Sequence, residues 1–149
     1  MKAFALEALR RLLFFSTPEA AALIGGVSEQ AWRRWESGAR SVPADVAGSM
    51  TMLADWRQSA LDAAVRQVGA APAGAAVALV WYSALEDWLS MAGREPVFWR
   101  PQQSAAAALS AEFPGRVQLV LFDAPAYAAW LAGRADDETA RSAWAASQI

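Results

Sequence analysis

Hydrophobic residues in the first half of the chain recur every three or four positions, which is the period of an α-helix. Leu6, Leu9 and Leu13 follow this spacing and predict a helix over residues 3–15. A longer helix is predicted over 43–68, because Pro43 suits a first helical turn and an apolar side follows it. That apolar side consists of Val46, Met50, Leu53, Leu61 and Val65.

Two short helices are predicted between these segments, because helix start and stop signals follow each other closely there. Ser16 and Glu19 form a capping box, with the serine at the N-cap and the glutamate three residues later. Gly25-Gly26 interrupts this first short helix. Ser28 caps the second, which is predicted to end at Gly38.

The pattern changes after residues 69–76, a small stretch punctuated by glycine and proline. The runs 77–82 and 116–123 are rich in β-branched and aromatic residues and predict strands, with helical patterns between and after them. We therefore predict a mainly α protein, α+β overall. Its predicted parts are a helical domain at 1–68, a linker at 69–76 and a small α+β dimerisation domain at 77–149 with two strands per chain.

The short helix from Ser28 to Ser37 is predicted to have two different faces. At about 100° per residue, Ala31, Trp32 and Trp35 fall on one side of it. The tryptophans are expected in the core, because this spacing separates them from the arginines and so argues against base stacking. The polar face consists of Gln30, Arg33 and Ser37, flanked by Glu29 and Arg34.

The sequence contains no cysteine and no histidine. This excludes disulfides, Cys/His zinc sites and the catalytic triads and dyads that need those residues. Lys2 is the only lysine. Carboxylates such as those of Glu86, Asp87 and Asp123 can in principle bind a metal, but no motif supports a nuclease. We expect a protein that is not an enzyme, with no cofactor and no metal.

The charge of the chain is small and unevenly divided. The formal net charge is −2, with +1 on residues 1–70 and −3 on residues 71–149. This balance argues against non-specific coating of nucleic acid and places the more basic half first. The N-terminus does not resemble a secretory signal, and no apolar run approaches about 20 residues. We therefore expect a cytoplasmic protein with no membrane partner.

The stretch from Ser16 to Pro43 resembles the Xre/Cro-type helix-turn-helix regulators. Their third helix ends in aromatic-Glu-x-Gly before a basic residue and a proline, here Trp35-Glu36-Ser37-Gly38, Arg40 and Pro43. More narrowly, EAAALIGGVSEQAWRRWESGARSVPADV is similar to the YdiL-like branch, which includes the Aca autorepressors of phage anti-CRISPR operons. The similarity covers about residues 3–66. It continues weakly in PVFWRPQQSAAAA, which resembles a Trp-Arg/Lys-x-x-Gln-Ser-x-Ala-Ala segment of that branch.

The resemblance implies a sequence-specific DNA-binding regulator, namely a homodimeric repressor of an inverted-repeat operator, autoregulation included. Arginine and glutamine suit the major-groove edges of guanine and adenine. By position, Gln30 and Arg33 fall at base-reading places, and Thr17 at the phosphate-touching start of a helix. The predicted DNA-binding set is Thr17, Ser28, Glu29, Gln30, Arg33, Arg34 and Arg40.

Three further points concern this stretch. Its turn, Gly25-Gly26, is one residue longer than the commonest helix-turn-helix. Glu29 places a carboxylate where many relatives carry a neutral or basic residue, so it either accepts from cytosine or repels phosphate. Glu36 is expected to pair with Arg40 or with the start of the next helix.

The two predicted strands indicate a dimer. About 34 residues separate them, and two strands rarely suffice for a stable sheet, so we expect them to pair with the same strands of a second copy. The residues expected to be buried in that four-stranded sheet are Val77, Leu79, Trp81, Leu119 and Leu121.

Other functions stay open at this stage. A protein-interaction module of antitoxin-like or phage-accessory type would make DNA binding secondary, and an exposed arginine face can contact RNA as well as DNA. The aromatic residues of the second half are more typical of core or interface than of an effector pocket for a small molecule. These residues are Trp81, Tyr82, Phe98, Trp99 and Trp130.

Overall fold

The computed structural model describes residues 1–149. It contains eight α-helices, a π-helical turn, a 3-10 turn and one two-stranded sheet, which confirms the prediction of a mainly α protein. The elements in order are α1 (Ala3–Leu12), α2 (Thr17–Ala20), η1 (Ala21–Gly25), α3 (Glu29–Glu36), α4 (Ala44–Ala70), β1 (Val77–Trp81), α5 (Leu85–Leu89), η2 (Pro96–Phe98), α6 (Trp99–Glu112), β2 (Val117–Leu121), α7 (Ala124–Leu131) and α8 (Glu138–Ala146).

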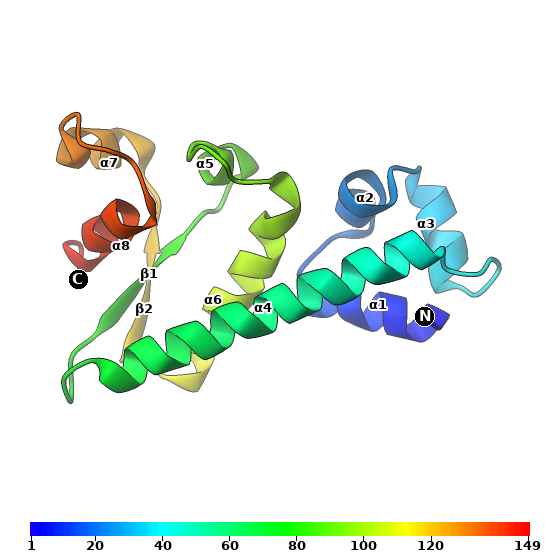
Figure 1. Ribbon diagram of the computed structural model, residues 1–149, viewed down its shortest axis with the longest axis horizontal. Coiled ribbons are helices and arrows are strands. Elements are labelled where there is room, and N and C mark those ends of the chain that lie inside the picture. Colours follow the sequence, from blue (N-terminus) through cyan, green and yellow to red (C-terminus); the bar gives the residue numbers. More distant parts are fainter.

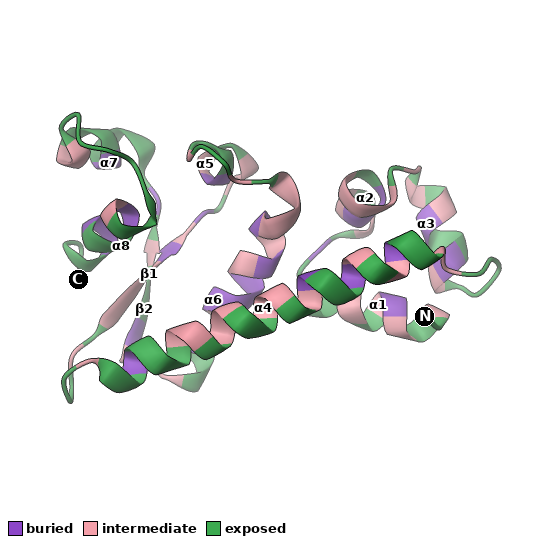
Figure 2. Cartoon of the chain, viewed as in Figure 1, coloured by how far each residue is buried: buried purple, intermediate pink, exposed green.

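The first three helices pack against the start of α4, and we call residues 3–53 the head (Figure 1). Their apolar faces form one core, and Figure 2 shows the buried residues on the sides that these helices turn toward each other. The helix ends follow the predicted signals, since Ser16 and Glu19 form the capping box and Ser28 caps α3. The core of the head consists of Leu6, Leu13, Phe15, Ala20, Ala21, Trp32, Trp35, Val46, Met50 and Leu53.

The longer turn between α2 and α3 is accommodated by a π-helical turn. After α2 the backbone widens into η1, and the amide of Val27 donates to the carbonyl of Ala21 at 3.0 Å. Gly26 then adopts φ +58°, a left-handed conformation that favours glycine. Gly25 lies so close to the core that an added Cβ would be 3.2 Å from the rings of both Trp32 and Trp35. Gly25 therefore allows the backbone to approach the two tryptophans, and Gly26 allows the chain to turn.

Helix α4 joins the two halves of the chain. It spans 27 residues, begins in the head and extends alongside α6 toward the sheet (Figure 1). Val46, Met50 and Leu53 bury their side chains in the head, whereas Val68 packs with Leu109 of α6 beside the sheet. One continuous helix therefore contributes to the core at each end of the molecule.

The strands lie where they were predicted, but they pair with each other and in parallel. Val77 lies opposite Val117, and Trp81 opposite Leu121. The chain crosses between the strands through α5, η2 and α6, because parallel strands need a long connection and cannot be joined by a hairpin. We call residues 77–149 the C-terminal unit. Its core contains Val80, Tyr82, Trp88, Trp99, Phe122, Tyr127, Trp144 and Ala145.

The end of the chain forms two helices, as its pattern predicts. Asp123 caps α7 and Asp137 caps α8, each by accepting from the backbone amide three residues later. Arg141 is buried against Asp136, which it contacts through two nitrogens at 2.7 and 2.9 Å. No helix of the molecule has the length and apolar character needed to cross a bilayer.

Candidate nucleic-acid interface

Helix α3 is anchored by its two tryptophans. Trp32 is 0% exposed and Trp35 is 8% exposed, and their rings meet edge to face at 5.6 Å. This confirms the predicted core placement and excludes these indoles as stacking platforms for bases. Because both side chains leave α3 on the same side, the opposite side is turned to solvent.

The predicted DNA-binding residues lie at the surface, but they do not form one continuous helix face. Ser28 is the N-cap of α3, where its hydroxyl accepts from the amide of Ala31 at 3.3 Å. Thr17 is half-buried at the first position of α2, and Arg40 lies in the loop that follows Gly38. The exposed members on or after α3 are Gln30, Arg33, Arg34 and Arg40.

Glu29 pairs with Arg33 across one turn of α3. Oε1 of Glu29 accepts from two nitrogens of Arg33, at 2.5 and 3.0 Å, while the two side chains remain 41% and 66% exposed. A surface pair of this spacing contributes only about 0.3–0.5 kcal/mol. The pair therefore holds Arg33 only weakly, although it places a carboxylate beside the guanidinium.

Arg34 and Arg40 have no acidic partner. Neither side chain forms an ion pair or a hydrogen bond within the chain, and the backbone amide of Arg40 donates to the carbonyl of Arg34 at 3.0 Å. That backbone contact holds the loop against the end of α3. The guanidinium groups of Arg34 and Arg40 are therefore exposed and unpaired.

We had predicted that Glu36 pairs with Arg40 or with the start of α4, but it pairs with neither. It accepts instead from Nε of Arg10 on α1 at 2.6 Å and from the indole N–H of Trp32 at 2.8 Å. The prediction was wrong because Arg10 is 26 residues away in sequence and only the packing of α1 on α3 brings it near. Glu36 thus holds α3 to α1 from the inside.

The sequence of this chain matches a known protein family. A family model described as Aca2/YdiL-like matches residues 1–117. The chain belongs to the Aca2/YdiL-like family. It is also similar to the Aca2 repressor of Pectobacterium phage ZF40, with 36% identity over 103 residues, which covers 68% of this chain and 86% of that protein.

The Aca2/YdiL-like match covers the head, α4, β1 and α6 but ends at the first residue of β2. All seven predicted DNA-binding residues therefore lie inside it, and so do Val77, Leu79 and Trp81. Leu119 and Leu121 lie outside it, together with α7 and α8.

The five residues predicted for a dimer interface have different surroundings. Val77 and Leu79 already pack within the chain, against the cluster of Val68, Leu109 and Val117. Trp81 is half-buried. Leu119 and Leu121 are exposed, at 39% and 60%.

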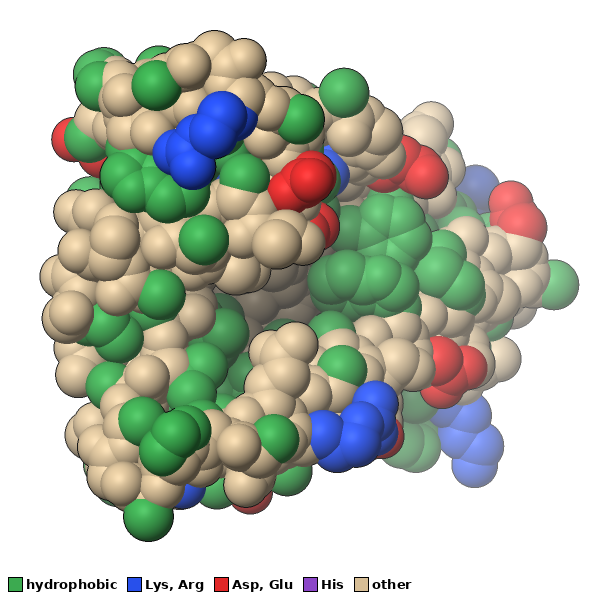
Figure 3. All heavy atoms as spheres, turned by 60° about the vertical axis from the view of Figure 1, so that its left-hand side comes forward, with side chains coloured by type: hydrophobic (Ala, Val, Ile, Leu, Met, Phe, Trp, Pro, Cys, Tyr) green, Lys and Arg blue, Asp and Glu red, His purple; other side chains and the backbone are tan.

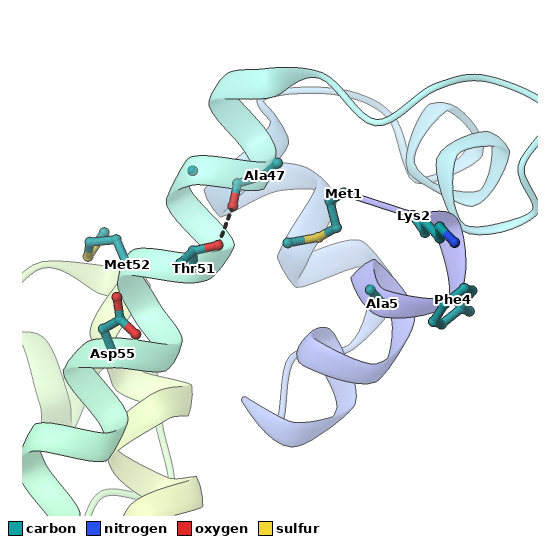
Figure 4. Close-up of a pocket in the computed structure, with 9 residues that line it drawn as sticks. Met1, Lys2, Phe4, Ala5, Ala47, Thr51, Met52 and Asp55 are labelled. Carbon is teal, nitrogen blue, oxygen red and sulfur yellow. Dashed lines mark hydrogen bonds between the residues drawn. The ribbon is translucent and has the colours of Figure 1, made fainter.

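Two grooves lie away from the polar face of α3. One, of about 280 Å³, is bounded by α4, α6, β1 and α8, and Figure 3 shows apolar side chains around a hollow in this part of the surface. Among the five aromatic residues considered for an effector pocket, only Tyr82 lines it. The other groove lies between the start of α1 and α4, where Met1, Phe4 and Met52 surround it (Figure 4). It shares no residue with the predicted DNA-binding set.

Two arginines outside the predicted set hold the head in place. Arg10 pairs with Glu36 inside the head, and Arg100 of α6 pairs with Glu19 of α2. The only sequence signal for Arg100 was its place in the Trp-Arg/Lys-x-x-Gln-Ser segment, whose role no local pattern reveals.

The ion pair of Glu36 predicts an acid-sensitive fold. Burial alone would raise the pKa of Glu36, but hydrogen bonds from Arg10 and Trp32 outweigh it and hold the pKa below the usual 4.5. A carboxyl whose pKa is lower in the folded state stabilises the fold above its unfolded pKa and loses this contribution as the pH falls through the folded value. Stability should therefore decline as the pH is lowered from about 5.

We expect Glu36→Gln to lower the free energy of unfolding at neutral pH by about 1–3 kcal/mol, because Arg10 loses its charged partner. Urea unfolding measured from neutral pH down to about pH 3 should also show a weaker pH dependence than in the wild type. Glu86→Gln is the matched control, since Glu86 is exposed and has no ion pair. Equal pH dependence in the Glu36 variant and the wild type would contradict this account.

Proposed function

We propose that this protein is a transcriptional repressor that binds an inverted-repeat DNA operator as a homodimer through a helix-turn-helix formed by α2 and α3. The outer face of α3 carries the proposal: Gln30, Arg33 and Arg34 are exposed there while two buried tryptophans fix the helix from behind. Membership of the Aca2/YdiL-like family and similarity to a phage Aca2 repressor support it. We include in this proposal that the protein represses its own gene.

In this proposal the residues divide by task. Gln30 and Arg33 read base edges in the major groove, where their side chains fit adenine and guanine. Arg34, Arg40 and Thr17 contact the backbone and set the register, with Ser28 and Glu29 at the start of the recognition helix. The two unpaired guanidinium groups support the backbone role, because no acidic group of the chain competes for them.

The open edge of β2 supports the proposed dimer. On β1 the outer edge is covered by α6, since Gln102 donates to the carbonyl of Val80 at 3.0 Å and Gln103 to that of Tyr82 at 2.7 Å. No side chain bonds to the backbone of β2, whose Leu119 and Leu121 are exposed. An open apolar edge needs a cover in a soluble protein. Pairing of β2 with β2 of a second copy would supply it and give a four-stranded sheet with two-fold symmetry.

We expect Leu121→Glu to give a folded monomer, because a charged side chain at this exposed position of β2 opposes edge-to-edge strand pairing. Its thermal unfolding in dilute solution should show an intact cooperative fold, and sedimentation should show half the mass of the wild type. Leu89→Glu, at an exposed apolar position on α5, is the matched control and should remain dimeric. A wild-type protein that sediments as a monomer at micromolar concentration would disprove this interface.

DNA binding should depend steeply on salt. Fluorescence anisotropy with an operator selected from random DNA would give the slope of log K against log salt, about −0.9 for each phosphate contact. Arg40→Ala should weaken binding to all sequences alike and reduce the slope by about 2 in a dimer, one contact from each copy. Arg66→Ala, which removes an exposed arginine from the far part of α4, should leave the slope unchanged. Wild-type protein that selects no DNA would refute the proposed function.

A further inference from the structure

Helix α6 of the C-terminal unit contacts the head through side chains of the Trp-Arg-x-x-Gln-Ser segment. The hydroxyl of Ser104 donates to the carbonyl of Leu12 at the end of α1 and accepts from Nε of Arg57 on α4 at 2.7 Å. Four residues earlier, Arg100 reaches Glu19 on α2, 81 residues away in the sequence. Helix α6 therefore contacts α1, α2 and α4, and each of these helices contributes residues to the head.

The two carboxylate oxygens of Glu19 have separate partners. Oε2 accepts from the amide and the hydroxyl of Ser16, both at 2.8 Å, and so completes the capping box of α2. Oε1 accepts from two nitrogens of Arg100, at 2.6 and 3.0 Å. Glu19 thus completes the N-terminal cap of α2 and also attaches α2 to the C-terminal unit.

Arg100 is itself held in position. Its third nitrogen donates to Oε1 of Gln103 at 2.7 Å, and its guanidinium lies 3.9 Å from the ring centre of Trp99. Gln103 and Trp99 both donate to the carbonyl of Tyr82, directly after β1. Arg100 is therefore linked, through Gln103 and Trp99, to the end of β1 as well as to α2.

The contact differs from an ordinary surface ion pair. The side chains of Arg100 and Glu19 are only 27% and 24% exposed. Burial alone would raise the pKa of Glu19, yet hydrogen bonds from Arg100 and Ser16 outweigh it and hold the pKa below its usual value. The carboxylate is consequently charged at neutral pH and keeps its partner.

The position of this contact matters for a protein that binds DNA with two heads. Glu19 lies in the helix that precedes α3, so its attachment to α6 fixes the rotation of the α2–α3 pair relative to the C-terminal unit. In a two-fold dimer that rotation sets the distance and phase between the two recognition helices, which match half-sites about 34–36 Å apart. One added base pair turns a half-site by about a tenth of a helical turn.

We propose that Arg100 is a positioning residue for operator recognition, which fixes the spacing between half-sites that the dimer selects by holding Glu19. This inference rests on the proposed function, because it needs a DNA-binding dimer. It assigns a role in DNA selectivity to a residue that lies outside the predicted interface and need not touch a base.

The test uses the full-length protein. Wild-type protein first selects its operator from a pool of random duplex DNA, and the affinity is then measured for that operator, for versions with one base pair added to or removed from the spacer, and for a single half-site. The variants are Arg100→Ala, Arg100→Lys and Glu19→Gln, with Arg66→Ala as a matched charge control. Circular dichroism melting reports whether each variant is folded.

Glu19→Gln disrupts the same contact from the α2 side, so it tests the inference even if Arg100→Ala does not fold. Glutamine still forms a capping box. However, its NH2 group takes the place of one carboxylate oxygen, so either Ser16 or Arg100 would face a donor instead of an acceptor. Arg100→Lys keeps one charge opposite Glu19 and should retain most of the wild-type behaviour.

We expect the wild type to prefer its selected spacer by about tenfold, a difference of about 1.4 kcal/mol. In Arg100→Ala and Glu19→Gln this preference should fall to about threefold or less, with half-site affinity unchanged and Arg66→Ala behaving as the wild type. Equal loss of affinity for every spacer, or an unchanged preference in both variants, would overturn the inference while leaving DNA binding intact. Failure of the wild type to select an inverted repeat would instead overturn the proposed function, and the inference with it.

Discussion

Replacing Trp32 by alanine is expected to destabilise the protein by about 3–5 kcal/mol, the usual result of removing a large aromatic side chain from a core. Trp32 is fully buried among α1, α3 and α4, and its ring packs edge to face on Trp35. A domain of this size is commonly stable by only about 5–15 kcal/mol. The substitution should therefore remove a large fraction of the stability and loosen the attachment of α3.

Two further variants separate the causes of this loss. Trp32→Phe keeps most of the apolar volume but removes the indole N–H that Glu36 accepts at 2.8 Å, so it should cost about 1.5–3 kcal/mol. Trp130→Ala changes a half-buried tryptophan of the C-terminal unit and should cost clearly less than Trp32→Ala. The measurement is the free energy of unfolding from urea titrations. If Trp32→Ala unfolded at the same denaturant concentration as the wild type, the core placement of this helix would be wrong.

The sequence predicts α3 well because its signals are local. A serine cap, a glycine stop and two tryptophans three residues apart lie within eleven residues, so the inward and outward faces follow from helical geometry alone. The pair of Glu29 and Arg33 could also have been predicted, because acidic and basic residues four apart on a helix face are neighbours. This pair gives Glu29 a partner within the helix, which the sequence reasoning did not weigh beside cytosine and phosphate.

Contacts between distant segments could not be predicted in this way. Nothing near Glu36 or Glu19 indicates Arg10 or Arg100 as a partner, because only tertiary packing brings them together. The same limit applies to the sheet, since a strand's alternation of side chains does not identify its neighbour or its direction. The π-helical turn was missed too, because the paired glycines mark only the interruption of the helix.

The variant with the largest expected effect on DNA binding is Arg33→Ala. One bidentate contact to guanine contributes about 1–3 kcal/mol of discrimination, and a dimer makes it twice, so operator affinity should fall by about 2–6 kcal/mol, or roughly 30-fold or more. The fold should persist, because the side chain is 66% exposed and its pair with Glu29 contributes little. Arg33→Lys should keep the salt dependence but weaken the preference for one base in each half-site, since the lysine ammonium lacks the planar fork of arginine. A folded Arg33→Ala protein with wild-type operator affinity would exclude α3 as the recognition helix.

In the proposed function, the pair with Glu29 keeps Arg33 neutralised until the operator is bound. If the carboxylate of Glu29 only neutralises Arg33, Glu29→Gln should raise affinity for unrelated DNA and lower the ratio of specific to non-specific binding, because a free guanidinium attracts any phosphate. The same substitution in an Arg33→Ala background should then change nothing, which a double-mutant cycle of binding free energies measures directly. If Glu29 instead accepts from a cytosine, its replacement should weaken operator binding in both backgrounds and relax one base position. The contact of Glu29 with Arg33 at 2.5 Å supports the first outcome.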